Sequence, residues 1–178
     1  MTRLLLGLPL ALLLGMVSCV SGGTSRGDSY RGQFLDAETG KPLAGVLVVF
    51  VWYRDVYSPV TRDITDEFHS AAEVWSGPDG HFEVSAAPEV ETGPLVVHVQ
   101  NPAIIFFAPG YIQERIDVKP GTKRFRGETR IYMKRVGNEA EALDLGLAPS
   151  FPYERTPLLL RALNQERMRL GLHPIPAR

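Results

Sequence analysis

The sequence has little of what several protein classes require: it contains one cysteine, no excess of positive charge and no long hydrophobic run. A single cysteine excludes an intramolecular disulfide framework and a CxxC redox or zinc pair. The 19 basic and 20 acidic residues give a formal charge of −1, which argues against a general nucleic-acid binder. The composition, 44% hydrophobic and 22% charged, is that of a globular protein.

Signals for catalysis are equally scarce. The sequence has no HExxH, P-loop or GxGxxG motif, so it does not predict an enzyme. His69 and Glu73 are expected on one strand, where a separation of four residues places them about 13 Å apart, too far to share a metal. Asp63, Asp66 and Glu67 do not follow the spacing of a calcium loop and are expected to be solvated. We therefore predict no metal, no cofactor and no catalytic residue.

The N-terminus predicts export. Arg3 precedes an apolar stretch, residues 4–17, that is shorter than the roughly 20 residues of a spanning helix, so residues 1–18 are predicted to be a signal peptide. The segment Met16-Val17-Ser18-Cys19 resembles the lipobox of bacterial lipoproteins. This resemblance implies cleavage before Cys19, lipid on Cys19 and an anchored position in the bacterial cell envelope. The alternative is a simple secretory signal with an incidental thiol.

Two further expectations follow for the anchored chain. In a Gram-negative host the resemblance implies the outer membrane, because Val20 stands where an inner-membrane lipoprotein would carry aspartate. Residues 19–29 are rich in glycine and serine and poor in apolar residues, so they are expected to form a flexible tether.

From about residue 30 to residue 136, short apolar runs alternate with Gly, Pro and Asp, a pattern typical of an all-β fold. The run of residues 44–53 predicts a central strand that is buried on both faces. Residues 54–68 are polar and predict a long connection. The remaining strands are expected at residues 33–35, 69–75, 81–85, 95–99, 103–107, 111–118 and 129–133. We thus predict a seven- or eight-stranded antiparallel β-sandwich of the transthyretin-like or immunoglobulin-like kind.

Three segments in this region resemble carboxypeptidase regulatory-like domains, which are related to the transthyretin (prealbumin) sandwich. They are residues 32–46, which include Thr39-Gly40-Lys41-Pro42, residues 79–84, which begin Asp79-Gly80, and Ala108-Pro109-Gly110-Tyr111. The resemblance covers residues 30–136 and implies a sandwich. Physically, these residues shape turns, and Tyr111 is suited to packing its ring while its hydroxyl reaches a partner.

The C-terminal extension, residues 137–178, predicts helix. Residues 138–147 suggest a short helix, and Thr156-Pro157 suggests the start of an amphipathic helix over about 157–170. Leu159, Leu163 and Glu166 share one side at helical spacing. We expect this helix to fold onto its own sandwich, because isolated helices of this length are marginal. Binding a partner is the alternative.

Aromatic residues provide the candidate contacts. Both tryptophans, Trp52 and Trp75, are expected in the core, because alternate strand residues fill a sandwich interior. Tyr53 and Tyr57 are the better surface candidates, with Trp52 as a third possible contact. The function favoured by the sequence is a non-catalytic envelope lipoprotein whose sandwich is a structural or protein-interaction module. The alternative is a carbohydrate-binding module on the cell envelope that uses these rings.

Overall fold

The computed structural model describes residues 29–85, 94–118, 129–137 and 151–176. Their elements are β1 (Ser29–Asp36), β2 (Leu47–Tyr57), β3 (Ile64–Trp75), β4 (His81–Ser85), β5 (Val96–Val99), β6 (Ala103–Phe107), β7 (Glu114–Asp117), β8 (Thr129–Met133), the 3-10 turn η2 (Tyr153–Arg155) and α1 (Pro157–Arg169). The all-β class with a C-terminal helix is confirmed. The predicted signal peptide, Cys19, nearly all of the tether and the suggested helix at 138–147 lie outside the described residues.

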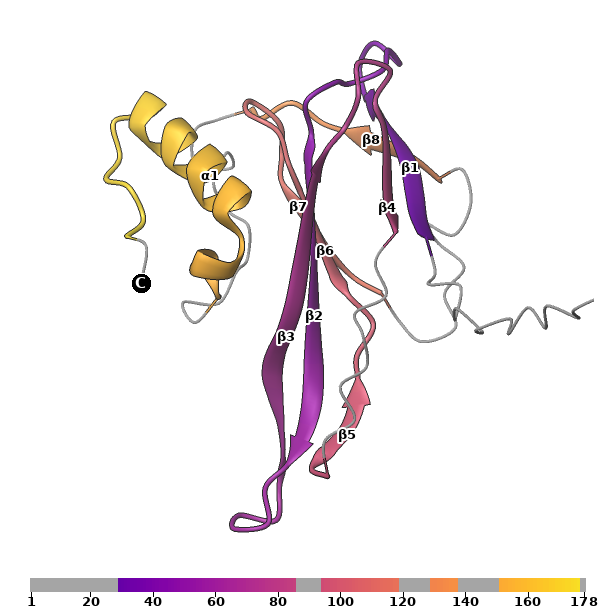
Figure 1. Cartoon of the computed structure of the whole chain (residues 1–178). Coiled ribbons are helices and arrows are strands. Elements are labelled where there is room, and N and C mark those ends of the chain that lie inside the picture. The colour runs from indigo at the N-terminus through magenta and orange to yellow at the C-terminus, as the bar shows by residue number, and fades with distance from the viewer. Residues whose placement is uncertain (1–28, 86–93, 119–128, 138–150, 177–178) are drawn as a thin grey trace, which may run out of the picture.

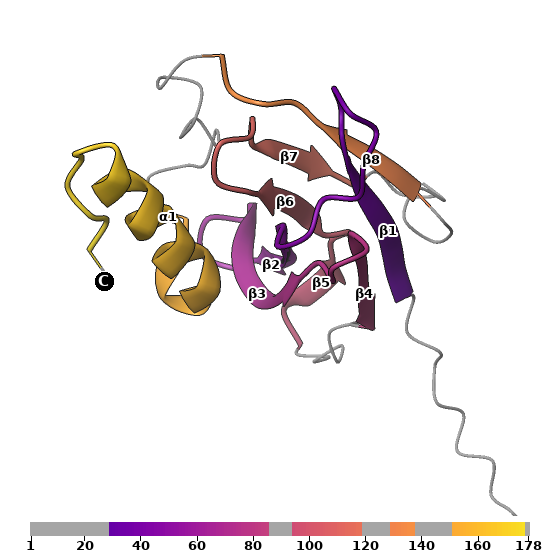
Figure 2. The ribbon, with the colours of Figure 1, turned by 90° about the horizontal axis from the view of Figure 1, so that it is seen from above.

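The strands form two sheets (Figures 1 and 2). One has the order β4–β1–β8. The other has the order β3–β2–β6–β7. Strands β6 and β5 pair with the same edge of β2, β6 with its first half (Leu47–Val51) and β5 with its second half (Arg54–Val56). Pairing is antiparallel except between β1 and β8, which run parallel and correct the expectation of a fully antiparallel sandwich. No hairpin joins these two strands, so their relative direction is not constrained by a tight turn.

The first half of β2 is buried on both faces, as predicted. Val48 and Phe50 face the other sheet and belong to the inter-sheet core, which also contains Phe34, Phe82 and Phe106. The alternate residues Leu47, Val49 and Val51 face the helix side of the sheet. All five of these β2 side chains are 0% exposed, because a two-residue repeat sends neighbours to opposite, equally covered faces.

Helix α1 covers the second face of the larger sheet, which confirms that the helix folds onto its own sandwich (Figure 1). Leu159, Ala162 and Leu163 pack against β2 and β6 residues in what we call the helix-side core. Thr156 precedes the helix as predicted, but its side chain makes no capping bond. The carboxylate of Glu73 on β3 accepts hydrogen bonds from the N–H groups of Leu158 and Leu159, at 3.0 and 2.7 Å, and satisfies the helix start instead.

The prediction of a long connection over residues 54–68 is wrong. Strand β2 continues to Tyr57 and β3 already begins at Ile64, so the two strands form a hairpin that projects beyond the sandwich (Figure 1). The register shifts between Trp52 and Tyr53, and we call residues 53–68, beyond that bulge, the arm. Most of the charged residues pair across the two strands, Arg54 with Glu67 and Asp55 with Asp66, so their polar composition does not mark a loop.

Candidate functional site

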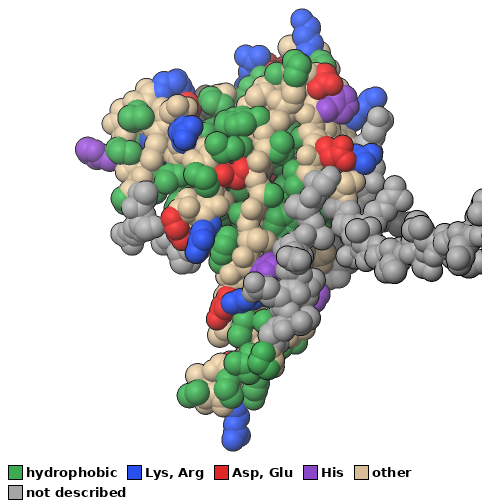
Figure 3. Space-filling view, in the orientation of Figure 1, with side chains coloured by type: hydrophobic (Ala, Val, Ile, Leu, Met, Phe, Trp, Pro, Cys, Tyr) green, Lys and Arg blue, Asp and Glu red, His purple; other side chains and the backbone are tan. Residues whose placement is uncertain are grey.

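Five exposed apolar side chains lie near the end of the arm. They are Tyr57 (38% exposed), Val60 (90%), Ile64 (58%), Leu95 (44%) and Val97 (59%), the last two contributed by the segment that runs alongside. Tyr57 pairs with Ile64 across the hairpin, and the Tyr57 N–H donates to the Leu95 carbonyl at 2.9 Å. Figure 3 shows hydrophobic side chains gathered over this end. We call these five residues the apolar tip.

Polar contacts hold the arm in shape behind the tip. The Arg54 guanidinium forms an ion pair with Glu67 at 3.1 Å across β2 and β3. The Gln100 side-chain amide donates to Asp55 at 2.6 Å and to Asp66 at 2.9 Å, and so bridges two carboxylates that face each other in register. Like charges directly opposite one another are destabilising in a sheet, and the shared amide donor offsets this.

The outer edge of the arm is open among the described residues. Strand β3 pairs with β2 along its length, and no described strand pairs with its other edge. Residues 64–67 of β3 are all exposed. An edge of this kind presents backbone N–H and C=O groups to which an extended segment from another chain can add.

A groove of about 450 Å³ lies where β5, β6 and β7 meet β2. Three of its lining side chains, Tyr53, Ala103 and Val118, are largely apolar. The others are polar or charged: Asp55, His98, Gln100, Asn101, Arg115 and Asp117. Tyr53 is half-buried, its ring meets that of Phe68 edge to face, and burial raises the pKa of its hydroxyl. The groove therefore combines one aromatic ring with several hydrogen-bonding groups.

The three aromatic candidates do not form one platform. Trp52 is 4% exposed and stacks on Phe50 in the inter-sheet core, so its ring is not available at the surface as a contact. Tyr53 lines the groove and Tyr57 belongs to the apolar tip. Trp75 was expected in the core but is 44% exposed, because it ends the edge strand β3 at the rim of the sheet.

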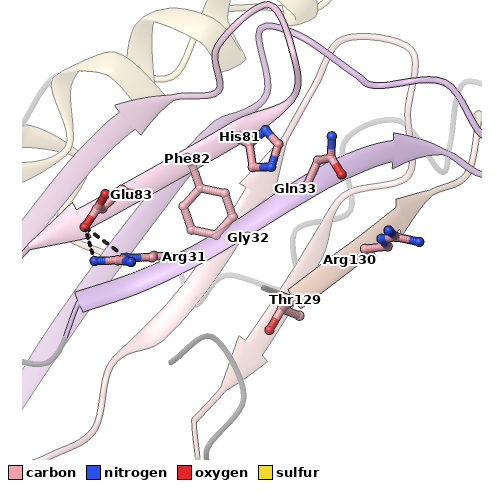
Figure 4. Close-up of a pocket in the computed structure, with 8 residues that line it drawn as sticks. All are labelled: Arg31, Gly32, Gln33, His81, Phe82, Glu83, Thr129 and Arg130. Atoms are coloured by element: carbon pink, nitrogen blue, oxygen red, sulfur yellow. Dashed lines mark hydrogen bonds and ion pairs between the residues drawn. The ribbon is translucent and has the colours of Figure 1, made fainter. Parts of the chain in front are cut away.

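A second hollow, of about 480 Å³, lies on the three-stranded sheet around Gly32 (Figure 4). The Arg31 and Glu83 side chains form an ion pair at 2.9 Å at one end of it. His81 on β4 and Thr129 on β8 also line the hollow, but β1 lies between their strands, so they are about 10 Å apart. This spacing is too wide for a histidine to activate a hydroxyl.

The end of the sandwich opposite the arm is built around the buried carboxylate of Asp36. Its Oδ1 accepts from the Thr39 N–H at 2.8 Å, and its Oδ2 accepts from the Tyr111 hydroxyl at 2.8 Å. Arg135 completes an ion pair at 3.2 Å. The hydrogen bond from Thr39, followed by that from Tyr111, holds the Asp36 pKa far below its ordinary value. The partner expected for the Tyr111 hydroxyl is thus Asp36, the last residue of β1.

The described residues contain no group of three or more histidine, cysteine or acidic side chains suited to a metal ion. No helix among them is long and apolar enough to cross a membrane. A GxSxG string does occur at residues 23–27, outside the described residues. In hydrolases that string follows a strand and opens a helix, and residues 23–27 follow the predicted signal segment instead.

Comparisons with known proteins give little more. None of the protein-family models matches the chain, and no curated protein matches it. Among solved structures, the chain is similar to the pilus 2b backbone protein of group B streptococcus, with 15% identity and a TM-score of 0.33. That match covers 63% of this chain and 42% of the pilus protein, so the chain spans less than half of that protein's length.

Proposed function

We propose that the protein is a non-catalytic, lipid-anchored protein of the bacterial envelope whose sandwich is a structural or interaction module. The arm would be its contact element for another envelope protein. The observation that carries this proposal is the open edge of β3, which is exposed over residues 64–67 and projects beyond the sandwich. An extended segment of a partner would add to this edge as a further strand.

The lipid anchor is tested by mass spectrometry of the mature protein. The proposal expects acyl chains on Cys19 as the first residue. An intact N-terminus, or an unlipidated chain that begins beyond Cys19, would exclude the anchor while leaving the arm open to test.

The contact is tested by photocrosslinking in cells. A photoreactive residue at Glu67, whose side chain is 49% exposed, should capture a discrete protein partner. The same group at Ala37, an exposed position in the turn at the opposite end of the sandwich, serves as the control. Equal capture from both positions would contradict a specific edge contact.

A second candidate function is carbohydrate binding, and the groove beside Tyr53 favours it. Saccharides are recognised by planar polar side chains that bond to hydroxyl groups, together with an aromatic ring that packs on the sugar. With Trp52 buried and Tyr57 at the tip, Tyr53 is the one candidate ring in this groove. Glycan-array binding that is lost in Tyr53→Ala and kept in Tyr57→Ala would support this function over the protein contact.

A further inference from the structure

The apolar tip lies at the end of the molecule where the chain enters the sandwich. Ser29 begins β1 and pairs with Ser85 at the end of β4, whereas Asp36 at the far end of β1 lies at the opposite pole. The Tyr30 ring packs on Phe50 of β2, with ring centroids 5.0 Å apart. From that level β2 runs on toward the tip (Figure 1).

The length of chain before Ser29 matches the projection of the arm. Tyr57 lies seven residues beyond Phe50, so the tip projects about 23 Å past the level at which β1 begins. Ten residue steps separate Cys19 from Ser29 and span at most about 33–36 Å. A chain anchored through Cys19 is therefore long enough for the tip to reach the anchoring bilayer and too short to carry the domain far from it.

The charges near the tip select the kind of contact. Residues 54–67 contain two arginines, Arg54 and Arg62, and four carboxylates, Asp55, Asp63, Asp66 and Glu67. This excess of negative charge does not attract anionic lipid. Apolar burial would provide the attraction, and the long stem of Arg62 in the turn allows its guanidinium to stay among lipid phosphates.

We propose that the apolar tip inserts shallowly into the boundary between headgroups and acyl chains of the same bilayer that holds the lipid on Cys19. The proposal rests on the lipid anchor of the proposed function. Anchoring keeps the bilayer at high effective concentration beside the tip, so a weak apolar contact suffices. The domain then contacts the bilayer at two points, the lipid on Cys19 and the apolar tip, and the edge of β3 lies above the headgroups.

The test places an environment-sensitive nitrobenzoxadiazole dye at residue 60. The lipidated full chain carrying Val60→Cys is labelled and reconstituted in phosphatidylcholine vesicles, with and without spin-labelled lipid. Val60 is 90% exposed, so the substitution leaves the core untouched. Labelled Ala37→Cys at the opposite pole is the matched control. We expect blue-shifted emission and quenching by spin-labelled lipid at residue 60, neither at residue 37, and no change when anionic lipid or salt is added.

Emission at residue 60 that matches residue 37 would overturn the proposal. A dye that stays in water on pure lipid, but whose position crosslinks to a protein in cells, would overturn it in favour of a protein occupant. Absence of lipid on Cys19 would refute the anchor of the proposed function, separately from insertion of the tip. In that event a polyhistidine tag in place of residue 19, bound to nickel-chelating lipid, restores the tether length, and insertion of the tip is judged by the same dye readout.

Discussion

The two halves of β2 are one strand with different surroundings. From Leu47 to Val51 every side chain is fully buried, between the opposite sheet on one face and α1 on the other. From Tyr53 onward the same strand is paired with β3 and β5, but its side chains are only partly buried or exposed. Burial on both faces of the first half stabilises the fold, and the second half presents exposed side chains to solvent.

Pairing alone would not hold an isolated hairpin, because two strands in water are marginal. The arm is stable as an extension because it continues strands already fixed in the body and gains β5 as a third strand. The apolar tip at its end is exposed and available for contact, whereas Tyr53 and Phe68 at its base pack against the helix-side core.

The largest expected effect is in the buried half. Phe50→Ala removes a ring that contacts Tyr30, Phe82 and Trp52, and should lower the free energy of unfolding by about 3–5 kcal/mol. Tyr57→Ala in the arm should change it by less than about 0.5 kcal/mol. Denaturant titration measures both variants. Equal losses would mean that the arm is part of the cooperative core.

The next largest loss of stability is expected where α1 attaches to β3, at Glu73. Glu73→Gln retains one acceptor oxygen but loses the charge at the start of α1, and should cost about 1–2 kcal/mol of unfolding free energy. Glu67→Gln, in the same strand but in the exposed arm, is the matched control and should cost less than about 0.5 kcal/mol. A larger loss at Glu67 would reverse the comparison.

A smaller effect is expected at the pole opposite the arm. Tyr111→Phe removes the hydroxyl that donates to Asp36 and should cost about 1 kcal/mol near neutral pH. Since the folded state lowers the Asp36 pKa from 3.8, the carboxylate stabilises the fold above that pH and this contribution is lost on further acidification. Asp36→Asn should therefore flatten the dependence of stability on pH below about 4. An unchanged acid profile would show that Asp36 is not the group responsible.

The smallest expected effect on stability is at the tip. Ile64→Ser should leave the thermal midpoint within about 2 °C of the original value, because the side chain is 58% exposed. The same variant should weaken any contact made by the arm. If the variant keeps both its thermal midpoint and the contact made by the arm, the tip does not contribute to that contact.

Much of the body could be predicted from the sequence, because its signals are local. The unbroken apolar run of β2 indicates burial on both faces, and the helical spacing of Leu159 and Leu163 indicates the face of α1 that packs. The arm could not be predicted, since its strands carry charges whose partners, such as Gln100 for Asp55 and Asp66, come from elsewhere in the chain. Capping of α1 by Glu73 was equally hidden, because 85 residues separate Glu73 from Leu158.

Hydrogen exchange across the whole chain tests the central claim that the arm is the contact element. Amides should be measured in native membranes and again after extraction into detergent. The account predicts strong protection at Leu47–Val51 in both states, and slower exchange in membranes than in detergent confined to the arm, residues 53–68, and the adjacent β5. Identical arm exchange in both states, or a gain confined to the opposite pole around Asp36, would contradict it.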